Sequence, residues 1–122
     1  EPVMVMADRV RLEQVLVNLF RNAIDATKTV PEPMIDVLLR AGEETAVISV
    51  RDNGQGIEDL DALFEPFYTT KQPGDGVGLG LAISSGIVKD FGGRLTARNG
   101  RAGGAVFDVH LPRLSDNVKA AE

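Results

Sequence analysis

The chain has 122 residues, 43% of them hydrophobic, which fits one globular domain with a single core. Its formal net charge of -5 argues against the basic surface that binds nucleic-acid phosphates, so nucleic acid is not expected as a partner. The absence of cysteine excludes a disulfide framework and a cysteine zinc site and is typical of a reducing compartment. Since neither a signal peptide nor a membrane-spanning run occurs, we expect a cytoplasmic domain without direct membrane contact.

The N-terminal half predicts a strand, a helix and a hairpin. Residues 3–6 are apolar and predict a strand, and Asp8 stands where an N-cap would begin a helix. The prolines at 31 and 33 end the helical pattern, and residues 34–40 and 45–51 predict adjacent antiparallel strands. Within the helix, apolar residues recur at three- and four-residue spacing and form a stripe that should face a sheet: Leu12, Val15, Leu16, Leu19, Ala23 and Ala26.

The C-terminal half predicts a long loop, a helix and a second hairpin. Residues 52–78 are rich in Gly, Asp, Pro and Thr, and loops of this length tend to be functional lids or disordered segments. Helical spacing returns over 79–91, and 94–98 and 105–111 predict two strands. This order predicts a two-layer α/β sandwich over residues 1–114, with a mixed sheet and helices on one face, followed by a polar tail at 115–122.

Three separated motifs suit the parts of a magnesium nucleotide. Asn18 and Asn22 share a helical stripe, and one amide oxygen would suffice for Mg²⁺, which keeps waters and phosphate oxygens as ligands. Asp52 follows a strand, where its carboxylate could accept from the exocyclic amine of adenine and would repel the carbonyl of guanine. Glycines from Gly74 onward lead into a helix whose free N–H groups around 78–81 could hold phosphate. Together the three motifs predict an ATP site.

Each motif alone also has a simpler explanation. Two asparagines can face solvent, Asp52-Asn-Gly54 can form a tight turn, and Lys71 can be an exposed lysine instead of a phosphate contact. The glycine cluster is neither a dinucleotide fingerprint nor a P-loop. His110, the only histidine, lies near a strand end and predicts a half-buried structural imidazole rather than a catalytic one.

Four ordered boxes resemble the catalytic and ATP-binding domain of sensor histidine kinases, within the ATPase superfamily shared with gyrase, heat-shock chaperones and mismatch-repair proteins. Residues 18–26, Asn-Leu-Phe-Arg-Asn-Ala-Ile-Asp-Ala, are similar to the N box. Residues 52–56 are similar to the first glycine box, 64–67 to the F box and 76–80 to the second glycine box. The resemblance covers nearly the whole chain and implies the Bergerat ATP-binding fold with a mobile ATP lid.

The resemblance also implies ATP and Mg²⁺ as cofactors and assigns roles by position. Asn18 and Asn22 would be the catalytic pair, with Asn22 as the magnesium ligand and Asn18 near the phosphates. Asp52 would bind adenine, and residues 64–70 with Lys71 would belong to the lid. The other implied nucleotide contacts are Asp25, Gly54, Gly56, Ile57, Gly76, Gly78, Leu79, Gly80 and Leu81.

Two details refine the resemblance. Residues 103–107 resemble the last glycine box, but Ala105 stands where the family often has threonine, which removes a hydroxyl near the adenine. Residues 64–71 with a short lid are similar to nitrogen-regulatory and dicarboxylate-sensing kinases.

The resemblance favours a kinase over an ATPase. ATP-hydrolysing relatives carry a glutamate as general base one turn before the metal asparagine, and here that position is Asn18. The γ-phosphate would go to a histidine on a separate dimerisation domain of the parent and from there to a response regulator. His110 lacks the acidic neighbour of such acceptors, so the isolated domain is expected to be inactive alone. It is also expected to be a monomer. A serine switch kinase, an ATPase and an inactive nucleotide-binding module remain alternatives.

The start at Glu1, without an initiator methionine, predicts a piece of a longer protein. An inner-membrane sensor in the parent is compatible with this expectation, and these residues carry no information on it.

Overall fold

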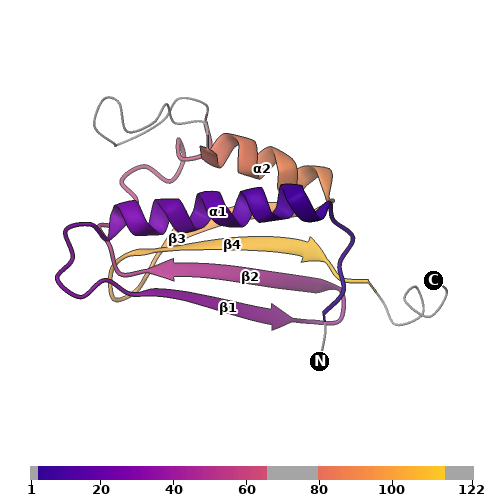
Figure 1. The fold of residues 1–122 in the computed structure, drawn as a ribbon, viewed down its shortest axis with the longest axis horizontal. Coiled ribbons are helices and arrows are strands. Elements are labelled where there is room, and N and C mark those ends of the chain that lie inside the picture. The colour runs from indigo at the N-terminus through magenta and orange to yellow at the C-terminus, as the bar shows by residue number, and fades with distance from the viewer. Residues whose placement is uncertain (1–2, 66–79, 115–122) are drawn as a thin grey trace.

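The computed structural model describes residues 3–65 and 80–114, which form two layers (Figure 1). One layer holds the helices α1 (Arg9–Ala26) and α2 (Gly80–Asp90). The other is a sheet of four strands: β1 (Ile35–Ala41), β2 (Thr45–Asp52), β3 (Arg94–Asn99) and β4 (Ala105–Pro112). Both helices cover the same face of the sheet, which confirms the predicted two-layer α/β sandwich.

The strands lie in the order β1-β2-β4-β3, and every neighbouring pair is antiparallel. The prediction of a mixed sheet is therefore wrong for the described strands. The connection through α2 does bring β3 back parallel to β2, but β4 lies between them, so no parallel pair forms. The strand predicted at 3–6 is also wrong, because that segment makes only one antiparallel bridge, between Val5 and Arg113.

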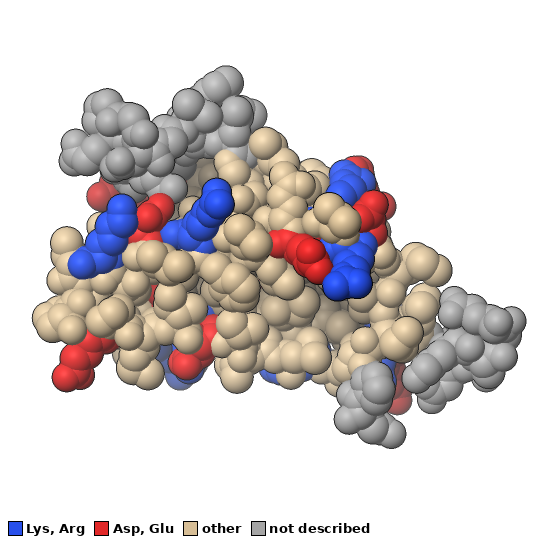
Figure 2. Space-filling view, viewed as in Figure 1, with Lys and Arg blue, Asp and Glu red and all other residues tan. Residues whose placement is uncertain are grey.

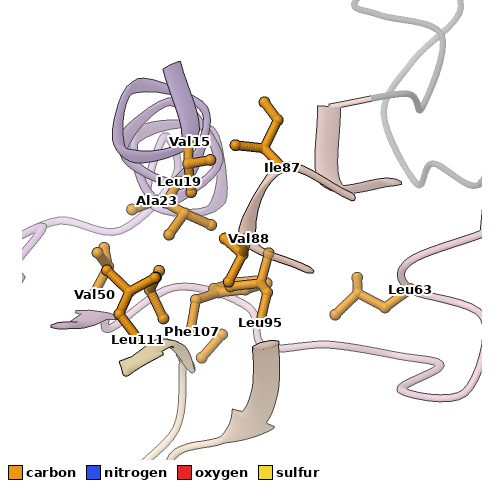
Figure 3. Close-up of a cluster of buried hydrophobic side chains, with 12 residues drawn as sticks. Val15, Leu19, Ala23, Val50, Leu63, Ile87, Val88, Leu95, Phe107 and Leu111 are labelled. Carbon is orange, nitrogen blue, oxygen red and sulfur yellow. The ribbon is translucent and has the colours of Figure 1, made fainter. Parts of the chain in front are cut away.

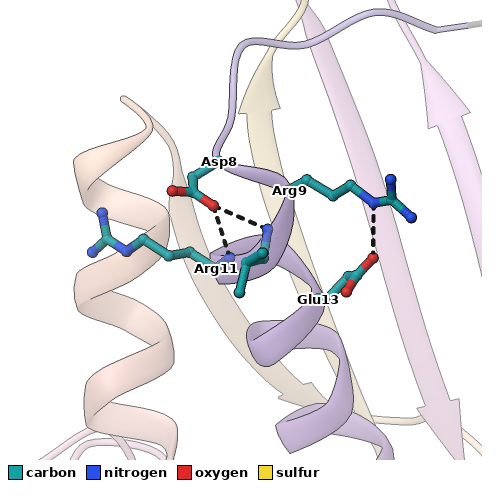
Figure 4. A network of polar contacts seen from close by, with 5 residues as sticks. Asp8, Arg9, Arg11 and Glu13 are labelled. Atoms are coloured by element: carbon teal, nitrogen blue, oxygen red, sulfur yellow. Dashed lines mark hydrogen bonds and ion pairs between the residues drawn. The ribbon is translucent and has the colours of Figure 1, made fainter.

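The helix α1 begins as predicted, with Asp8 as its N-cap. Asp8 Oδ1 accepts hydrogen bonds from the N–H groups of Val10 at 2.9 Å and Arg11 at 3.2 Å (Figure 4). One turn further on, Arg9 Nε pairs with Glu13 Oε1 at 3.1 Å, but both side chains are exposed and such a pair contributes little. An N-cap side chain typically contributes about 1 kcal/mol, so Asp8 is the contact that fixes the first turn.

The apolar stripe of α1 faces the sheet, as predicted. Val15 and Leu19 are fully buried in one core that draws on both helices, on β2, β3 and β4, and on the loop after β2 (Figure 3). Its members are Val15, Leu19, Ala23, Val50, Leu63, Ile87, Val88, Leu95, Ala105, Phe107, Val109 and Leu111. No residue of β1 belongs to this cluster. The core therefore anchors α1 and β2, which carry the candidate site, and leaves β1 at its margin.

The charged side chains are mixed in sign over the face drawn in Figure 2, where acidic and basic residues alternate without a continuous basic area. A phosphate-backbone binder gathers Lys and Arg together, which this face does not do. Within the described segments, neither helix combines the length and the apolar character needed to cross a bilayer.

Candidate functional site

Asp52 ends β2 on the face covered by the helices, since alternate residues of a strand point the same way and Val50 lies in the core. The side chain is 5% exposed. Its Oδ1 atom accepts hydrogen bonds from the N–H groups of Gly54 at 2.9 Å and Ala105 at 3.3 Å. Because a buried carboxylate is costly without partners, these two donors both stabilise Asp52 and fix the direction of its second oxygen.

Two glycines allow three backbone segments to meet at Asp52. A Cβ atom at Gly54 would lie 2.3 Å from the carbonyl oxygen of Ala26, the last residue of α1. A Cβ atom at Gly104 would lie 1.9 Å from the carbonyl oxygen of Asp52, and the φ angle of Gly104 is 75°. The end of α1, the loop after β2 and the turn before β4 therefore meet here only because both residues lack a side chain.

Asn99, at the end of β3, holds the loop that follows Gly54. Its Oδ1 accepts from the N–H of Ile57 at 2.7 Å, and its Nδ2 donates to the carbonyl of Ile57 at 3.2 Å. A Cβ atom at Gly56, whose φ is 82°, would approach the same Oδ1 to 3.0 Å. One side chain thus pairs both backbone groups of Ile57 and fixes the loop 54–57 relative to the sheet.

Asn18 joins α1 to the first turn of α2. Its Nδ2 donates to Ser84 Oγ at 3.0 Å and lies 3.5 Å from the carbonyl oxygen of Gly80. Ser84 is fully buried, which restricts the position of Asn18. At this end of a helix the first N–H groups lack intrahelical partners and favour anions. The structure therefore brings Asn18 beside the predicted phosphate contacts Gly80 and Leu81.

Asn22 follows Asn18 by one turn on the same stripe of α1 and is half-buried. With a rise of about 1.5 Å per residue, the stripe from Asn18 to Ala26 spans about 12 Å, from the start of α2 to Gly54. In the last turn, Asp25 Oδ1 lies 3.3 Å from Lys28 Nζ.

No group of three or more His, Cys, Asp or Glu that could hold a metal occurs in the described part of the chain. A cation at Asn22 would therefore depend on one amide oxygen together with oxygens of its ligand and water. Magnesium accepts that arrangement, so the residues present fit it.

The predicted site residues that the structure describes thus form one row along α1, from the start of α2 to the loop after β2. Asn18, Gly80 and Leu81 mark one end, Asn22 lies between, and the other end holds Asp25, Asp52, Gly54, Gly56 and Ile57. Outside the described residues lie Lys71, Gly76, Gly78, Leu79, the predicted lid beyond Glu65 and the tail at 115–122.

Sequence reasoning did not identify Ser84 or Asn99 as parts of the site. Ser84 could have been identified, because it lies within an apolar helical run and a buried hydroxyl needs a hydrogen-bond partner. Asn99 carried no such signal, since Asn-Gly between two predicted strands is typical of a hairpin turn. Its partner Ile57 lies 42 residues away in the sequence, so only the fold reveals the contact.

His110 lies on the opposite face of the sheet from Phe107 and Val109. Its Nε2 is 2.9 Å from Thr96 Oγ1. Burial lowers the pKa of His110 below its ordinary value, the nearby guanidinium of Arg94 lowers it further, and Asp108 opposes them. The ring is half-buried, as predicted, and the sheet separates it from the row of site residues.

Comparison with known proteins gives a consistent family. The model of "Histidine kinase-, DNA gyrase B-, and HSP90-like ATPase" matches residues 7–115. Sensor protein FixL of Bradyrhizobium diazoefficiens is 39% identical over 117 residues, which make up 93% of this chain and 23% of FixL. The C4-dicarboxylate transport sensor protein DctB of Pseudomonas aeruginosa is 41% identical over 114 residues, which make up 90% of this chain and 18% of DctB. The chain thus spans about a fifth of these relatives.

Solved structures are similar over most of the chain. The catalytic domain of histidine kinase ThkA, in a nucleotide-free form, has a TM-score of 0.77 and 36% identity, covering 89% of this chain and 71% of that chain. The mycobacterial sensor histidine kinase MprB has a TM-score of 0.82 and 26% identity, covering 93% of this chain and 80% of that chain.

Proposed function

Because the chain belongs to the family of histidine kinase-, DNA gyrase B- and HSP90-like ATPases, and within it to the catalytic domains of histidine kinases, we propose that it binds ATP and transfers the γ-phosphate to a histidine on a separate dimerisation domain of its parent. The observation that carries this proposal is the row along α1, with Asn18 at the first turn of α2 and Asp52 at the far end. The parent would then pass the phosphate to a response regulator in the cytoplasm.

Asp52 selects adenine. Its Oδ1 is held by two backbone N–H groups, and the second oxygen accepts a hydrogen bond from the exocyclic amine of the base. Guanine places a carbonyl at that position and is repelled by the carboxylate. Ala105 supplies a backbone N–H to Asp52 without the hydroxyl that the family often has there, so the carboxylate keeps its orientation and one further contact to the base is lost.

The phosphates would lie at the first described turn of α2, where the N–H groups of Gly80 and Leu81 would donate to them. The amide oxygen of Asn22 would hold Mg²⁺, which would neutralise phosphate charge when bound. Catalysis by this chain consists mainly of orientation, because phosphoryl transfer needs an aligned acceptor and donor more than covalent assistance from the protein.

Hydrolysis to water is slow because Asn18 cannot act as a general base. Its amide nitrogen donates to Ser84 Oγ, and a neutral amide does not take up a proton at working pH. This argument favours phosphotransfer over an ATPase cycle.

The test is a labelling experiment with radiolabelled ATP and magnesium. The chain alone should neither label itself nor release phosphate above a trace, and the histidine-bearing dimerisation domain of the parent should become an acid-labile, base-stable phosphoprotein. Asn22→Ala should abolish the label through loss of the metal ligand, whereas His110→Gln should leave it unchanged. Rapid ATP turnover by the chain alone would favour the ATPase alternative, and acid-stable labelling of a partner would favour the serine kinase.

Asn99→Ala should weaken ATP binding by about 3- to 10-fold, because it frees the loop 54–57 at a cost of about 1 kcal/mol. Asp8→Ala is the matched control. The Asp8 side chain also holds two backbone groups, the N–H of Val10 at 2.9 Å and that of Arg11 at 3.2 Å, but these lie at the start of α1, at the opposite end of the helix from Gly54. Calorimetric titration with ATP should separate the two variants, and an equal loss of affinity in both would contradict the role of Asn99.

A further inference from the structure

The strand β1 is an open and apolar edge of the sheet. The strand order places it outermost, and β2 is its only partner among the described strands (Figure 1). Its large apolar side chains are exposed, at 38% for Ile35, 51% for Val37, 49% for Leu38 and 59% for Leu39. Protein edges are usually blunted by lysine, proline or a bulge, and β1 has none of these in its continuous register with β2. Such an edge is suited to pairing with another strand.

The free hydrogen-bonding groups of β1 belong to its odd-numbered residues. Even-numbered residues at both ends turn toward β2, because the carbonyl of Met34 accepts from Asn53 N–H at 3.3 Å and the N–H of Gly42 donates to Thr45 at 2.8 Å. Orientation alternates along an antiparallel strand, so the odd-numbered residues from 35 to 41 present their N–H and C=O groups outward.

The two charges of β1 are placed symmetrically about Leu38, with Asp36 two residues before it and Arg40 two residues after it. In an antiparallel pair of two copies centred on Leu38, each Asp36 lies opposite Arg40 of the other copy. Val37 lies opposite Leu39, and both of these carry outward hydrogen-bonding groups. A shift of two residues removes the pairing of opposite charges, and parallel in-register pairing places like charges together. The pattern therefore specifies one register.

We propose that β1 is the docking site for a second copy of this chain, joined by an antiparallel strand pair centred on Leu38. The pair makes one continuous sheet from the two copies and satisfies the outward groups of both strands. Within its own copy, Asp36 pairs with Arg51 Nη2 of the neighbouring strand β2 at 2.9 Å, and its side chain remains exposed to the other copy. One strand per copy is a small interface, so we expect a dissociation constant of about 10–100 µM. The monomer predicted from the sequence is then the state of the dilute domain.

Sedimentation velocity tests the pairing on the whole chain, at concentrations from about 5 to 500 µM. The unmutated chain should pass from monomer to dimer over this range. Leu38→Lys places two like charges face to face on the two-fold axis and should remain monomeric. Leu60→Lys is the matched control, because Leu60 is an exposed leucine of similar exposure, 44%, in the loop after β2. It should dimerise like the parent sequence, and thermal melting should show that both variants are folded.

A charge swap tests the register. Arg40→Asp places two carboxylates opposite each other and should abolish the dimer, and Asp36→Arg should do the same with two guanidinium groups. An equimolar mixture of the two variants restores both opposite-charge pairs and should form a heterodimer. Asp36→Arg also breaks the contact of Asp36 with Arg51. If Asp36→Arg does not fold for this reason, the loss of the dimer in Arg40→Asp decides the test.

The proposal is overturned if the unmutated chain stays monomeric at the highest concentration, or if Leu38→Lys leaves the dimer intact. It is also overturned if the edge of a monomeric chain binds an extended strand from elsewhere in the parent kinase, which would assign β1 to a different occupant.

Discussion

Replacing Gly104 by alanine should lower the free energy of unfolding by about 2–4 kcal/mol. The new Cβ atom would lie 1.9 Å from the carbonyl oxygen of Asp52, at a φ angle of 75° that side chains rarely adopt. Relief requires the turn before β4 to move, and Ala105 N–H, which holds Asp52 Oδ1, moves with it. Urea unfolding should therefore show the loss of stability, and calorimetry should show weaker ATP binding in the same variant.

Substitutions at two other glycines distinguish the close contact with Asp52 from the strain of a positive φ angle. Gly103→Ala adds a Cβ atom at φ 103° with nothing within 4 Å, so it should cost only the strain, about 1 kcal/mol. Gly86→Ala lies inside α2 with nothing within 4 Å and should stabilise the chain by about 0.5–1 kcal/mol. Equal losses for Gly103→Ala and Gly104→Ala would show that the approach to Asp52 is not the cause.

Local signals predicted most of the fold. The N-cap at Asp8 and the 3.6-residue stripe through Val15 and Leu19 determine α1 within its own sequence, and both hairpins lie close to their predicted ranges. Strand order is not local. The position of β3 beyond β4 depends on where the chain returns after α2, and nothing in the residues 94–99 specifies a neighbour. The segment 3–6 failed for a related reason, because a short apolar run predicts a strand but not the partner it would need.

The candidate site also combines residues that can be recognised from the sequence with residues that only the fold reveals. Asn18, Asp52 and the glycine pair at 103–104 stand out as residue types with an expected chemistry, and the fold brings Asn18 to α2 and Asp52 to the turn before β4. The groups that orient them were not predictable, because Ser84 and Asn99 act across 66 and 42 residues of sequence. The residues that bind ligand can be recognised from their types, whereas the residues that orient them are reached only through long-range contacts of the fold.

Asp52→Asn should weaken ATP binding by about 10- to 150-fold while leaving the fold intact. A hydrogen bond to a charged group contributes roughly 1.5–3 kcal/mol, which sets this range. The fold should survive because the amide oxygen can still accept from Gly54 and Ala105. Those two donors then direct the new amide nitrogen to the place of the second carboxylate oxygen, where it meets the amine of adenine as donor against donor.

The same geometry predicts a change in base preference. The amide nitrogen introduced by Asp52→Asn can donate to the carbonyl of guanine, so the ratio of ATP to GTP affinity should fall by more than the loss of ATP affinity alone. Asp108→Asn is the matched control, because Asp108 is buried to a similar degree, 6% exposed, but bonds Ser49 at 2.5 Å on the other face of the sheet. It should change stability and leave both affinities unchanged. Calorimetric titrations with ATP and GTP decide the matter, since equal ATP affinities for Asp52→Asn and the parent sequence would remove Asp52 from the adenine site.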